Sequence, residues 1–220
     1  LAMFCGVPVN IVIDPDYNGL EKSFAWINKL PDYKGVFVDS ATALDLVNSG
    51  TLLIITDVCN KFQFESPALY ESCNNVVIID HHRQSAEYAV KPAVVYIEPS
   101  ASSASELVSE MIEQQLPPGT LLKEEAEMLF AGIILDTKQF TRNTGTRTFG
   151  AALYLRGQGA LPGESSDLFR SDVDDLTKEA RFHTNVLIYR DRIAISYVDE
   201  EADESYRVIA AKAADKLLTV

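Results

Sequence analysis

One short stretch of the sequence carries residues that can bind metals and move protons. Four apolar residues at positions 76–79 run directly into Asp80, His81 and His82. The apolar run predicts a strand buried on both faces, and ligands bind beyond the carboxyl ends of such strands in open α/β sheets. An acid and two imidazoles at that place are costly to keep unless something pairs with them. The stretch therefore predicts the functional site.

Two further acids stand where they could join it. Asp57 follows the apolar run 52–56, and Asp136 lies near the end of a strongly apolar helix. Carboxylates with one imidazole nitrogen from His81 suit Mn²⁺ or Mg²⁺, whereas zinc sites favour more His and Cys. Two carboxylate-bridged ions can hydrolyse a phosphoester by activating water. Taken singly, either acid also fits a plainer role as a helix cap or an ion-pair partner.

Strands that alternate with helices must position these residues. The pattern predicts an α/β fold with a mostly parallel sheet and helices on both faces, followed by part of a smaller α+β domain. The expected strands are 9–14, 35–39, 52–57, 76–80 and 93–98. The expected helices are 20–29, 40 to about 50 with Ser40 as N-cap, 67–73, 101–115, 124–136 and 146–156.

The last third of the chain has a different order of predicted elements. Glycines and a proline at 157–163 predict a linker. An acidic helix is expected over 168–184, and then a β-hairpin whose strands 186–190 and 193–198 flank Asp191-Arg192, and a helix over 206–218. We therefore expect a first domain over 1–156, a linker and helix over 157–184, and the start of a second domain over 185–220. The abrupt first residues and the small second domain predict a fragment at both ends.

Composition narrows the class of partner. The 220 residues contain 32 acids against 19 Lys and Arg, for a net charge of −13. This balance argues against binding of long nucleic acid, which needs clustered basic residues. The three cysteines lack CxxC spacing and fit a reduced cytosolic compartment. No signal peptide and no apolar run long enough to span a bilayer is present in the sequence.

The order of the candidate residues resembles a known family. Asp57, the triplet Asp80-His81-His82 and the Leu-Asp-Thr-Lys segment at 135–138 together resemble the DHH phosphoesterase family. Further segments look like its cyclic-di-AMP phosphodiesterase branch, namely Tyr-Ile-Glu-Pro at 96–99, Ala-Ser-Ser at 101–103, Ala-Gly-Ile-Ile-Leu-Asp-Thr-Lys at 131–138 and Thr-Gly-Thr-Arg-Thr-Phe at 144–149. The resemblance covers nearly the whole chain.

The resemblance implies a two-manganese hydrolase that opens a cyclic dinucleotide to linear pApA. Carried over by position, Asp57 bridges both ions, and His81 and Asp136 bind the second ion. His82 then faces the substrate phosphate, and Asp80 orients an imidazole from behind.

The resemblance gives three further residues a place near phosphate. Ser102 and Ser103 open the helix expected from 101, where an anion binds well, although from the residues alone plain capping is the favoured explanation. Arg147 is expected beside a phosphate as well, and a structural ion pair is an equal alternative for it.

The departures from the family pattern matter as much. Nothing in the sequence matches the family's opening His-x-x-x-Asp-x-Asp strand, and the chain stops before its glycine- and histidine-rich substrate loop. Cys59-Asn60-Lys61 also differs from what that branch carries after Asp57. We therefore expect an inactive fragment that holds one weak Mn²⁺ site or none. The parent is expected to be membrane-anchored with this part in the cytoplasm. Whether it forms a homodimer is left undecided by the sequence.

Other functions remain open at this point. Within the family, the alternatives are an oligoribonuclease or nuclease acting on short nucleic acid, and a pyrophosphatase, which would need a strongly basic pocket. From a different class, the chain could be a catalytically dead module that binds a nucleotide without hydrolysing it.

Overall fold

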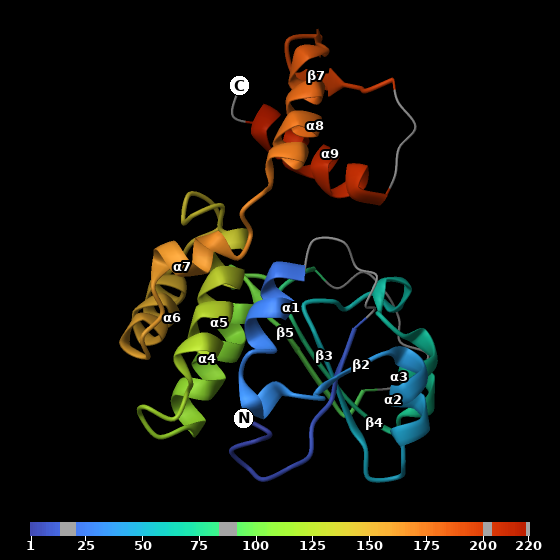
Figure 1. Ribbon diagram of the computed structural model, residues 1–220, viewed down its shortest axis with the longest axis vertical. Helices are drawn as coiled ribbons and strands as arrows, with labels where there is room; N and C mark the ends of the chain where they lie inside the picture. Colours follow the sequence, from blue (N-terminus) through green and yellow to red (C-terminus); the bar gives the residue numbers. More distant parts are fainter. Residues whose placement is uncertain (14–20, 84–91, 200–203, 219–220) are drawn as a thin grey trace. The chain divides into compact units, whose positions relative to one another are not determined.

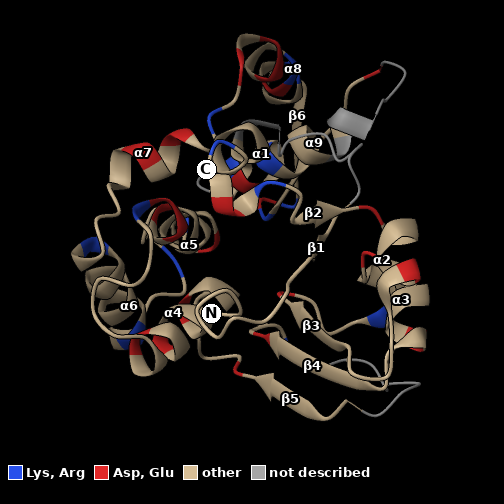
Figure 2. Ribbon diagram, turned by 60° about the horizontal axis from the view of Figure 1, so that its bottom comes forward, with Lys and Arg blue, Asp and Glu red and all other residues tan. Residues whose placement is uncertain are grey.

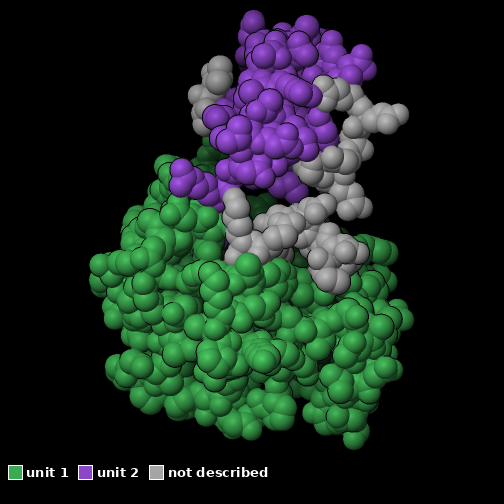
Figure 3. Space-filling model, viewed as in Figure 1, with its two compact units in different colours: residues 1–17, 22–168 green, residues 18–21, 169–220 purple. Residues whose placement is uncertain are grey.

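The computed structural model describes residues 1–13, 21–83, 92–199 and 204–218 (Figure 1). Contacts between Cα atoms divide the chain into two compact units, residues 1–17 with 22–168 and residues 18–21 with 169–220 (Figure 3). The division after residue 168 falls inside the segment 157–184 that was expected to connect two domains. Within the described ranges, no helix is both long and apolar enough to cross a membrane.

The first unit is built on parallel strands. Strand β1 (Ile11–Val12) pairs with β2 (Phe37–Val38), and β3 (Leu52–Thr56), β4 (Asn75–Asp80) and β5 (Val94–Ile97) form a second sheet in that order. Every pairing in these two sheets is parallel, as predicted. In the described part of the first unit the strands lie in two sheets and not in one. The last residue of the strand expected over 9–14 lies outside the described residues.

The central strand β4 is less buried than its sequence predicts. Val76 and Ile78 are fully buried, but Val77 and Ile79 on the opposite face are only half-buried. The prediction of burial on both faces is therefore wrong. Side chains alternate between the faces of a strand, and in β4 only the face that carries Val76 and Ile78 belongs to the apolar core beside this sheet.

Helices lie on both sides of these strands (Figure 1). Helices α2 (Ser40–Leu46) and α3 (Pro67–Ser72) cover one face. They share with the sheet a core made of Ala43, Cys59, Phe64, Leu69, Tyr70, Cys73, Val76 and Ile78. The short helix α1 (Glu21–Ile27) precedes β2, and two 3-10 helices, Pro31–Tyr33 and Lys61–Gln63, lie in the connections.

The start of α2 corrects the sequence prediction by one residue. Asp39 is the N-cap, because its carboxylate accepts a hydrogen bond from the Thr42 N–H at 2.7 Å. Ser40, predicted as the cap, is the first helical residue. The helix ends at Leu46, short of the expected residue 50, where the Asn48 side chain forms a turn with the N–H two residues on.

The remaining helices of the first unit form a second core. Helices α4 (Ala104–Gln115), α5 (Lys123–Asp136), α6 (Thr146–Gly157) and α7 (Pro162–Asp167) pack together. Their shared cluster consists of Ile112, Leu116, Leu121, Ala126, Phe130, Ile133, Ile134, Ala151, Leu155 and Ala160. Helix α7 begins inside the predicted linker, which corrects that prediction. Proline is favoured in the first helical turn, since its missing N–H would be unpaired there anyway.

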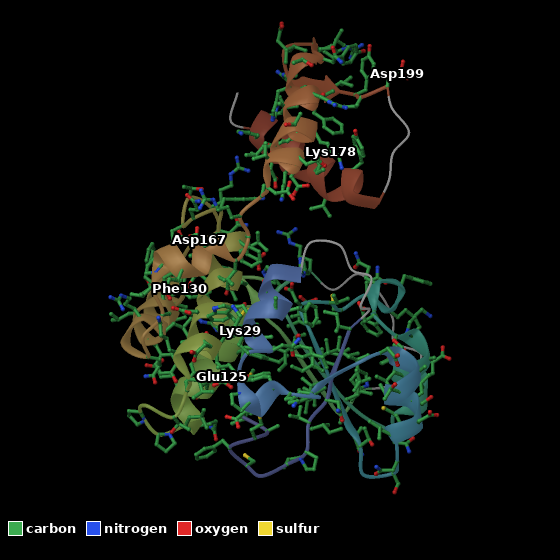
Figure 4. The ribbon with its side chains drawn as sticks, viewed as in Figure 1. Lys29, Glu125, Phe130, Asp167, Lys178 and Asp199 are labelled. Carbon is green, nitrogen blue, oxygen red and sulfur yellow. The ribbon has the colours of Figure 1, made fainter. Side chains whose placement is uncertain are left out.

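Close packing of α4 against α5 depends on a glycine. A Cβ atom added to Gly132 would clash with the Ser105 hydroxyl across the helix interface. Figure 4 labels two other residues of α5, Phe130 and Glu125. Phe130 belongs to the helical core, and Glu125 accepts a hydrogen bond of 2.6 Å from the Tyr33 hydroxyl, which lies before β2. These contacts set the position of α5, whose last residue is Asp136.

The second unit contains a hairpin and two helices. Helix α8 (Val173–Thr184) is shorter than the expected 168–184, and α9 (Glu204–Leu217) follows the hairpin. Strands β6 (Val186–Tyr189) and β7 (Ile193–Ser196) pair antiparallel, as predicted. The connection is a three-residue turn with Arg190 and Asp191 in the left-handed conformation, so it starts one residue earlier than expected.

Candidate metal centre

Three acidic residues mark the carboxyl ends of the three-stranded sheet (Figure 2). Asp57 directly follows β3, Asp80 ends β4 and Glu98 follows β5. Asp57 has a left-handed backbone with φ of 66°, and its N–H donates to the Ile79 carbonyl at 2.9 Å. This conformation is costly for a residue other than glycine, and such strain collects at functional sites. The side chain of Asp57 therefore departs from the alternation of side chains between the two faces of the strand, and 53% of it is exposed.

Asp80 is the buried hub of the triplet. Its side chain is fully buried, and Oδ1 accepts hydrogen bonds from the N–H groups of His81 at 2.7 Å and His82 at 3.1 Å. The same oxygen lies 2.8 Å from Nδ1 of His82. Burial alone would raise the pKa of Asp80, but hydrogen bonds from the Cys59 thiol, the His82 ring and the two backbone N–H groups outweigh it and lower the pKa. Asp80 is therefore a carboxylate whose Oδ1 is already engaged.

His81 faces two carboxylates with one ring nitrogen. Its Nε2 lies 3.3 Å from Oδ1 of Asp57 and 3.6 Å from Oδ2 of Asp136. The hydrogen bond with Asp57 raises the pKa of His81, burial opposes this, and the charges of Asp136 and Asp57 and a hydrogen bond to the Ala101 backbone raise it further. The structure thus brings together the three residues that the sequence predicted as metal ligands. A positive charge at this nitrogen would be attracted to both acids.

The electrostatics at Asp136 show that this place is short of positive charge. Burial raises the pKa of Asp136, and the nearby charge of Asp57 raises it further. Two carboxylates that converge on one imidazole offer the oxygen and nitrogen donors that a divalent ion such as Mn²⁺ accepts. One potential ligand atom each from Asp57, Asp80, His81 and His82 also lies within 4.8 Å of the others. Oδ1 of Asp80 is engaged, whereas its buried Oδ2 has no hydrogen-bond partner. Asp57 and Asp136 both face Nε2 of His81, so these three residues fit such an ion best.

His82 lies beside this centre with a different environment. Its side chain is 59% exposed, and its ring centroid is 4.3 Å from that of His81. The contact between Nδ1 and Asp80 fixes the orientation of the ring. A predicted role toward the substrate phosphate is compatible with this exposure.

The two serines predicted near phosphate have protein partners. Ser102 and Ser103 are buried, and Ser103 caps α4 by accepting a hydrogen bond of 3.0 Å from the Glu106 N–H. The helix therefore begins at Ala104, three residues later than predicted. The Ser102 hydroxyl donates to Oε2 of Glu106 at 2.6 Å. Contact of either serine with phosphate stays a prediction.

Arg147 takes part in the ion pair that was the alternative to phosphate binding. Its guanidinium lies 2.8 Å and 2.5 Å from the two carboxylate oxygens of Glu110, with Glu98 at 3.8 Å. The Tyr96 hydroxyl is 3.4 Å away. The pKa of Arg147 is raised chiefly by the Glu110 hydrogen bonds. Arg147 is 40% exposed, so a further contact with an anion stays a prediction.

Sequence reasoning missed the role of Glu106. This carboxylate is 1% exposed and receives hydrogen bonds from the Ser102 backbone, the Ser102 hydroxyl and the Thr148 hydroxyl. The spacing Ser103-x-x-Glu106 is a capping-box signature and could have singled it out. That signature predicts a bond from Glu106 to the N–H of the cap itself, whereas here it binds the N–H one residue earlier.

The chain is similar to known proteins over most of its length. The model of the DHH family, N-terminal domain, matches residues 9–133. The chain is 37% identical over 213 residues to the cyclic-di-AMP phosphodiesterase GdpP of Bacillus subtilis, covering 96% of this chain and 32% of that protein. It is 38% identical over 197 residues to the cyclic-di-AMP phosphodiesterase PdeA of Listeria monocytogenes, covering 88% of this chain and 30% of that protein. The chain thus spans about a third of the length of these curated relatives.

A solved structure supports the fold alone. An exopolyphosphatase-related protein from Bacteroides fragilis superposes with a TM-score of 0.70 at 17% identity, over 96% of this chain and 66% of that chain. The parallel α/β architecture predicted from the sequence is confirmed by the structure and by this likeness.

Proposed function

This chain belongs to the DHH family, and on that premise we propose that it carries the metal centre of a phosphodiesterase that opens cyclic-di-AMP to linear pApA. The observation that carries the proposal is the convergence of Asp57 and Asp136 on one nitrogen of His81. The relatives named as cyclic-di-AMP phosphodiesterases support the substrate class. The net charge of −13 favours a dinucleotide over a long nucleic acid.

We assign the ion-binding role to Asp57, His81 and Asp136, with Mn²⁺ as the proposed ion. When bound, such ions lower the pKa of water and draw negative charge from the phosphoryl oxygens. For this, His81 must be neutral with its proton on Nδ1, so that Nε2 offers a lone pair. Asp57, the more exposed of the two acids, is proposed to bridge toward a second ion.

The other two members of the triplet are proposed to act on the substrate and on each other. His82, in its protonated form, donates its Nε2–H to a phosphate oxygen, because Asp80 holds Nδ1. Asp80 stays unprotonated, as its lowered pKa favours, and fixes the ring through a charge-assisted hydrogen bond. Ser102, Ser103 and Arg147 remain proposed neighbours of a phosphate. None of the three cysteines, all of which lie in the described part of the chain, forms a disulfide, which fits the cytoplasmic location that we propose.

A hydrolysis assay with a matched pair of variants tests the proposal. The full-length parent protein, supplied with Mn²⁺, should convert cyclic-di-AMP to pApA, followed by chromatography, and should act less on linear dinucleotides and on pyrophosphate. Residues 1–220 alone are expected to hydrolyse none of these, because the sequence lacks the family's opening His-x-x-x-Asp-x-Asp strand. Asp57→Asn should lose this activity, whereas Asp45→Asn on the exposed side of α2 should keep it. Turnover of pyrophosphate or of linear oligonucleotides alone would favour the alternative family activities. Binding without turnover would favour a regulatory module.

A further inference from the structure

We propose that Thr137 is a positioning residue that fixes Asp136 toward His81, by holding the left-handed turn (residues 138–140) that follows helix α5. Thr137 comes directly after Asp136 and is fully buried, whereas Asp136 is 29% exposed. The Thr137 hydroxyl is bonded within the protein, so its effect on an ion is exerted through Asp136. The consequence for Mn²⁺ binding and turnover rests on the proposed function, but the structure of the turn does not.

The backbone of the left-handed turn is the first observation. Lys138, Gln139 and Phe140 follow one another with φ of 49°, 58° and 63°. Residues other than glycine enter this region at a cost, and they normally do so singly and not in runs. A run of three must therefore be held in place by contacts elsewhere. Such strain collects at functional sites, and this run begins two residues after Asp136.

Thr137 supplies the contacts that hold the run. Its N–H and its hydroxyl both donate to the Ile133 carbonyl, at 3.0 Å and 2.6 Å. The hydroxyl oxygen accepts a hydrogen bond of 2.9 Å from the Phe140 N–H. The Thr137 carbonyl accepts hydrogen bonds from the N–H groups of Thr141 and Arg142, both at 2.9 Å. One buried residue thus ties the last turn of α5 to the far end of the left-handed turn.

The ring of Phe140 holds the same turn from its other end. Its centroid lies 6.0 Å from that of Phe130 on α5 and 5.7 Å from that of Phe149 on α6, and the second pair is stacked at 21°. Phe140 also packs against the helical core. Apolar and aromatic contacts of this kind favour the backbone that places the ring there. They offset the cost of the left-handed run.

The position of Asp136 depends on this turn. Asp136 is the last residue of α5, and the ends of helices fray unless their backbone is held. The peptide group between Asp136 and Thr137 is planar, and its N–H is fixed on the Ile133 carbonyl. From that backbone Oδ2 of Asp136 lies 3.6 Å from Nε2 of His81. Because a binding site must be held to within about 0.5 Å, loosening of the turn should weaken an ion site that includes Asp136.

Two variants separate the hydroxyl of Thr137 from its shape. Thr137→Val removes the hydroxyl at nearly the same size, whereas Thr137→Ser keeps it. In the full-length parent protein, calorimetry should show Mn²⁺ affinity reduced about 10- to 100-fold by Thr137→Val, as loss of a residue behind a metal ligand usually does. Thr137→Ser should retain most of the affinity. The matched control is Thr177→Val in α8, because the Thr177 hydroxyl also donates to the carbonyl four residues earlier, at 2.8 Å. It should leave the affinity unchanged.

Hydrogen exchange of the metal-free parent protein gives a second readout. Thr137→Val should speed exchange at the amides of residues 139–142 about tenfold, and exchange in strand β4 should stay the same. A merely global loss of stability would accelerate exchange in β4 as well. If Thr137→Val fails to fold, Thr137→Cys, whose thiol is only a weak hydrogen-bonding group, should give smaller changes of the same sign in both readouts.

Either readout can overturn the inference. A folded Thr137→Val protein with the natural Mn²⁺ affinity would refute it, and so would equal acceleration of exchange in the turn and in β4. A parent protein that binds Mn²⁺ but leaves cyclic-di-AMP intact would refute the proposed function, while the affinity of Thr137→Val would still decide this inference. A parent protein that binds no Mn²⁺ would remove the metal centre and the role of Thr137 with it.

Discussion

The carboxylate of Glu106 and the carboxylates of Asp57 and Asp136, all in the first unit, have opposite surroundings. Glu106 is 1% exposed, and one of its oxygens collects three hydrogen bonds. Asp57 and Asp136 are 53% and 29% exposed, and they share a single imidazole nitrogen at more than 3 Å. At Glu106 the protein supplies donors to Oε2, although the buried Oε1 has no hydrogen-bond partner and lies 3.9 Å from Nε of Arg147. The pair Asp57 and Asp136 is the incomplete set, since two acids converge on one ring nitrogen.

The contrast shows how a structural acid can be told from one reserved for a ligand. Hydrogen-bond donors that converge on a carboxylate stabilise it and hold its neighbours, as at Glu106. Carboxylates that converge on each other repel, and the pKa of Asp136 rises through burial and through the charge of Asp57. Neutralising Glu106 should therefore mainly lower stability, whereas neutralising Asp57 or Asp136 should mainly lower metal affinity.

The largest effect should come from the incomplete set. Asp136→Asn keeps the shape of the side chain but removes a proposed ligand, so Mn²⁺ affinity and hydrolysis should fall by more than about 100-fold. The metal-free protein should unfold at the same or a higher temperature, because ionised Asp136 is disfavoured in the folded state. Calorimetry and thermal unfolding measure the two effects. A variant that binds Mn²⁺ normally would remove Asp136 from the site.

Neutralising Glu106 should have the reverse effect, a loss of stability. Glu106→Leu leaves buried donors of Ser102 and Thr148 unpaired, which should lower the free energy of unfolding by about 2–4 kcal/mol. Glu110→Gln breaks an exposed ion pair with Arg147 and should cost less than about 1 kcal/mol. Urea unfolding of both variants tests the ranking. Equal losses would mean that burial does not separate these two acids.

A smaller effect is expected at the helix contact that places both sets. Gly132→Ala would push a methyl group into the Ser105 hydroxyl, so it should lower stability by about 1–3 kcal/mol. Gly150 in α6 offers the control, because nothing lies within 4 Å of a Cβ added there. Gly150→Ala should instead raise stability by up to about 1 kcal/mol. Urea unfolding midpoints of the two variants should therefore move in opposite directions, and a shared direction would contradict the proposed packing constraint.

The smallest effect should be a dependence on pH confined to the incomplete set. The pKa of His81 is raised above its usual 6.5, so its stabilising contribution is complete below that value and is lost as pH rises through the raised pKa. Mn²⁺ binding has the opposite sign, because the ion competes with that proton and gains up to about tenfold in affinity per pH unit. The increase in melting temperature caused by Mn²⁺ should therefore grow from pH 6.5 upward. An increase in melting temperature that stays the same at every pH would show that Mn²⁺ binding displaces no proton from His81.

Much of the site could be predicted from the sequence because it depends on strand ends. Parallel strands place their carboxyl ends at one edge, so Asp57 and the triplet after residue 79 had to lie near each other once the strands were recognised. Asp136 followed from the end of an apolar helix. The family resemblance joined the three, and local patterns were sufficient to order the elements.

The remaining features depend on contacts that local patterns do not encode. Thr148 meets Glu106 across 42 residues, so no spacing rule indicates that pair. Asp39 and not Ser40 is the N-cap. Either residue type satisfies the capping preference, so only the final geometry decides between them. Helix α7 began in a glycine-rich segment because Pro162 can start a helix as readily as break one.

The left-handed backbone of Asp57 has a consequence for laboratory evolution. Glycine adopts φ near 66° freely, whereas a side chain there costs about 1–2 kcal/mol. A random library screened only for heat resistance should therefore enrich glycine at position 57, and the survivors would be proteins without the Asp57 carboxylate. Selection for Mn²⁺ binding should keep aspartate at that codon and accept the lower melting temperature. The two selection pressures separate at this one backbone angle.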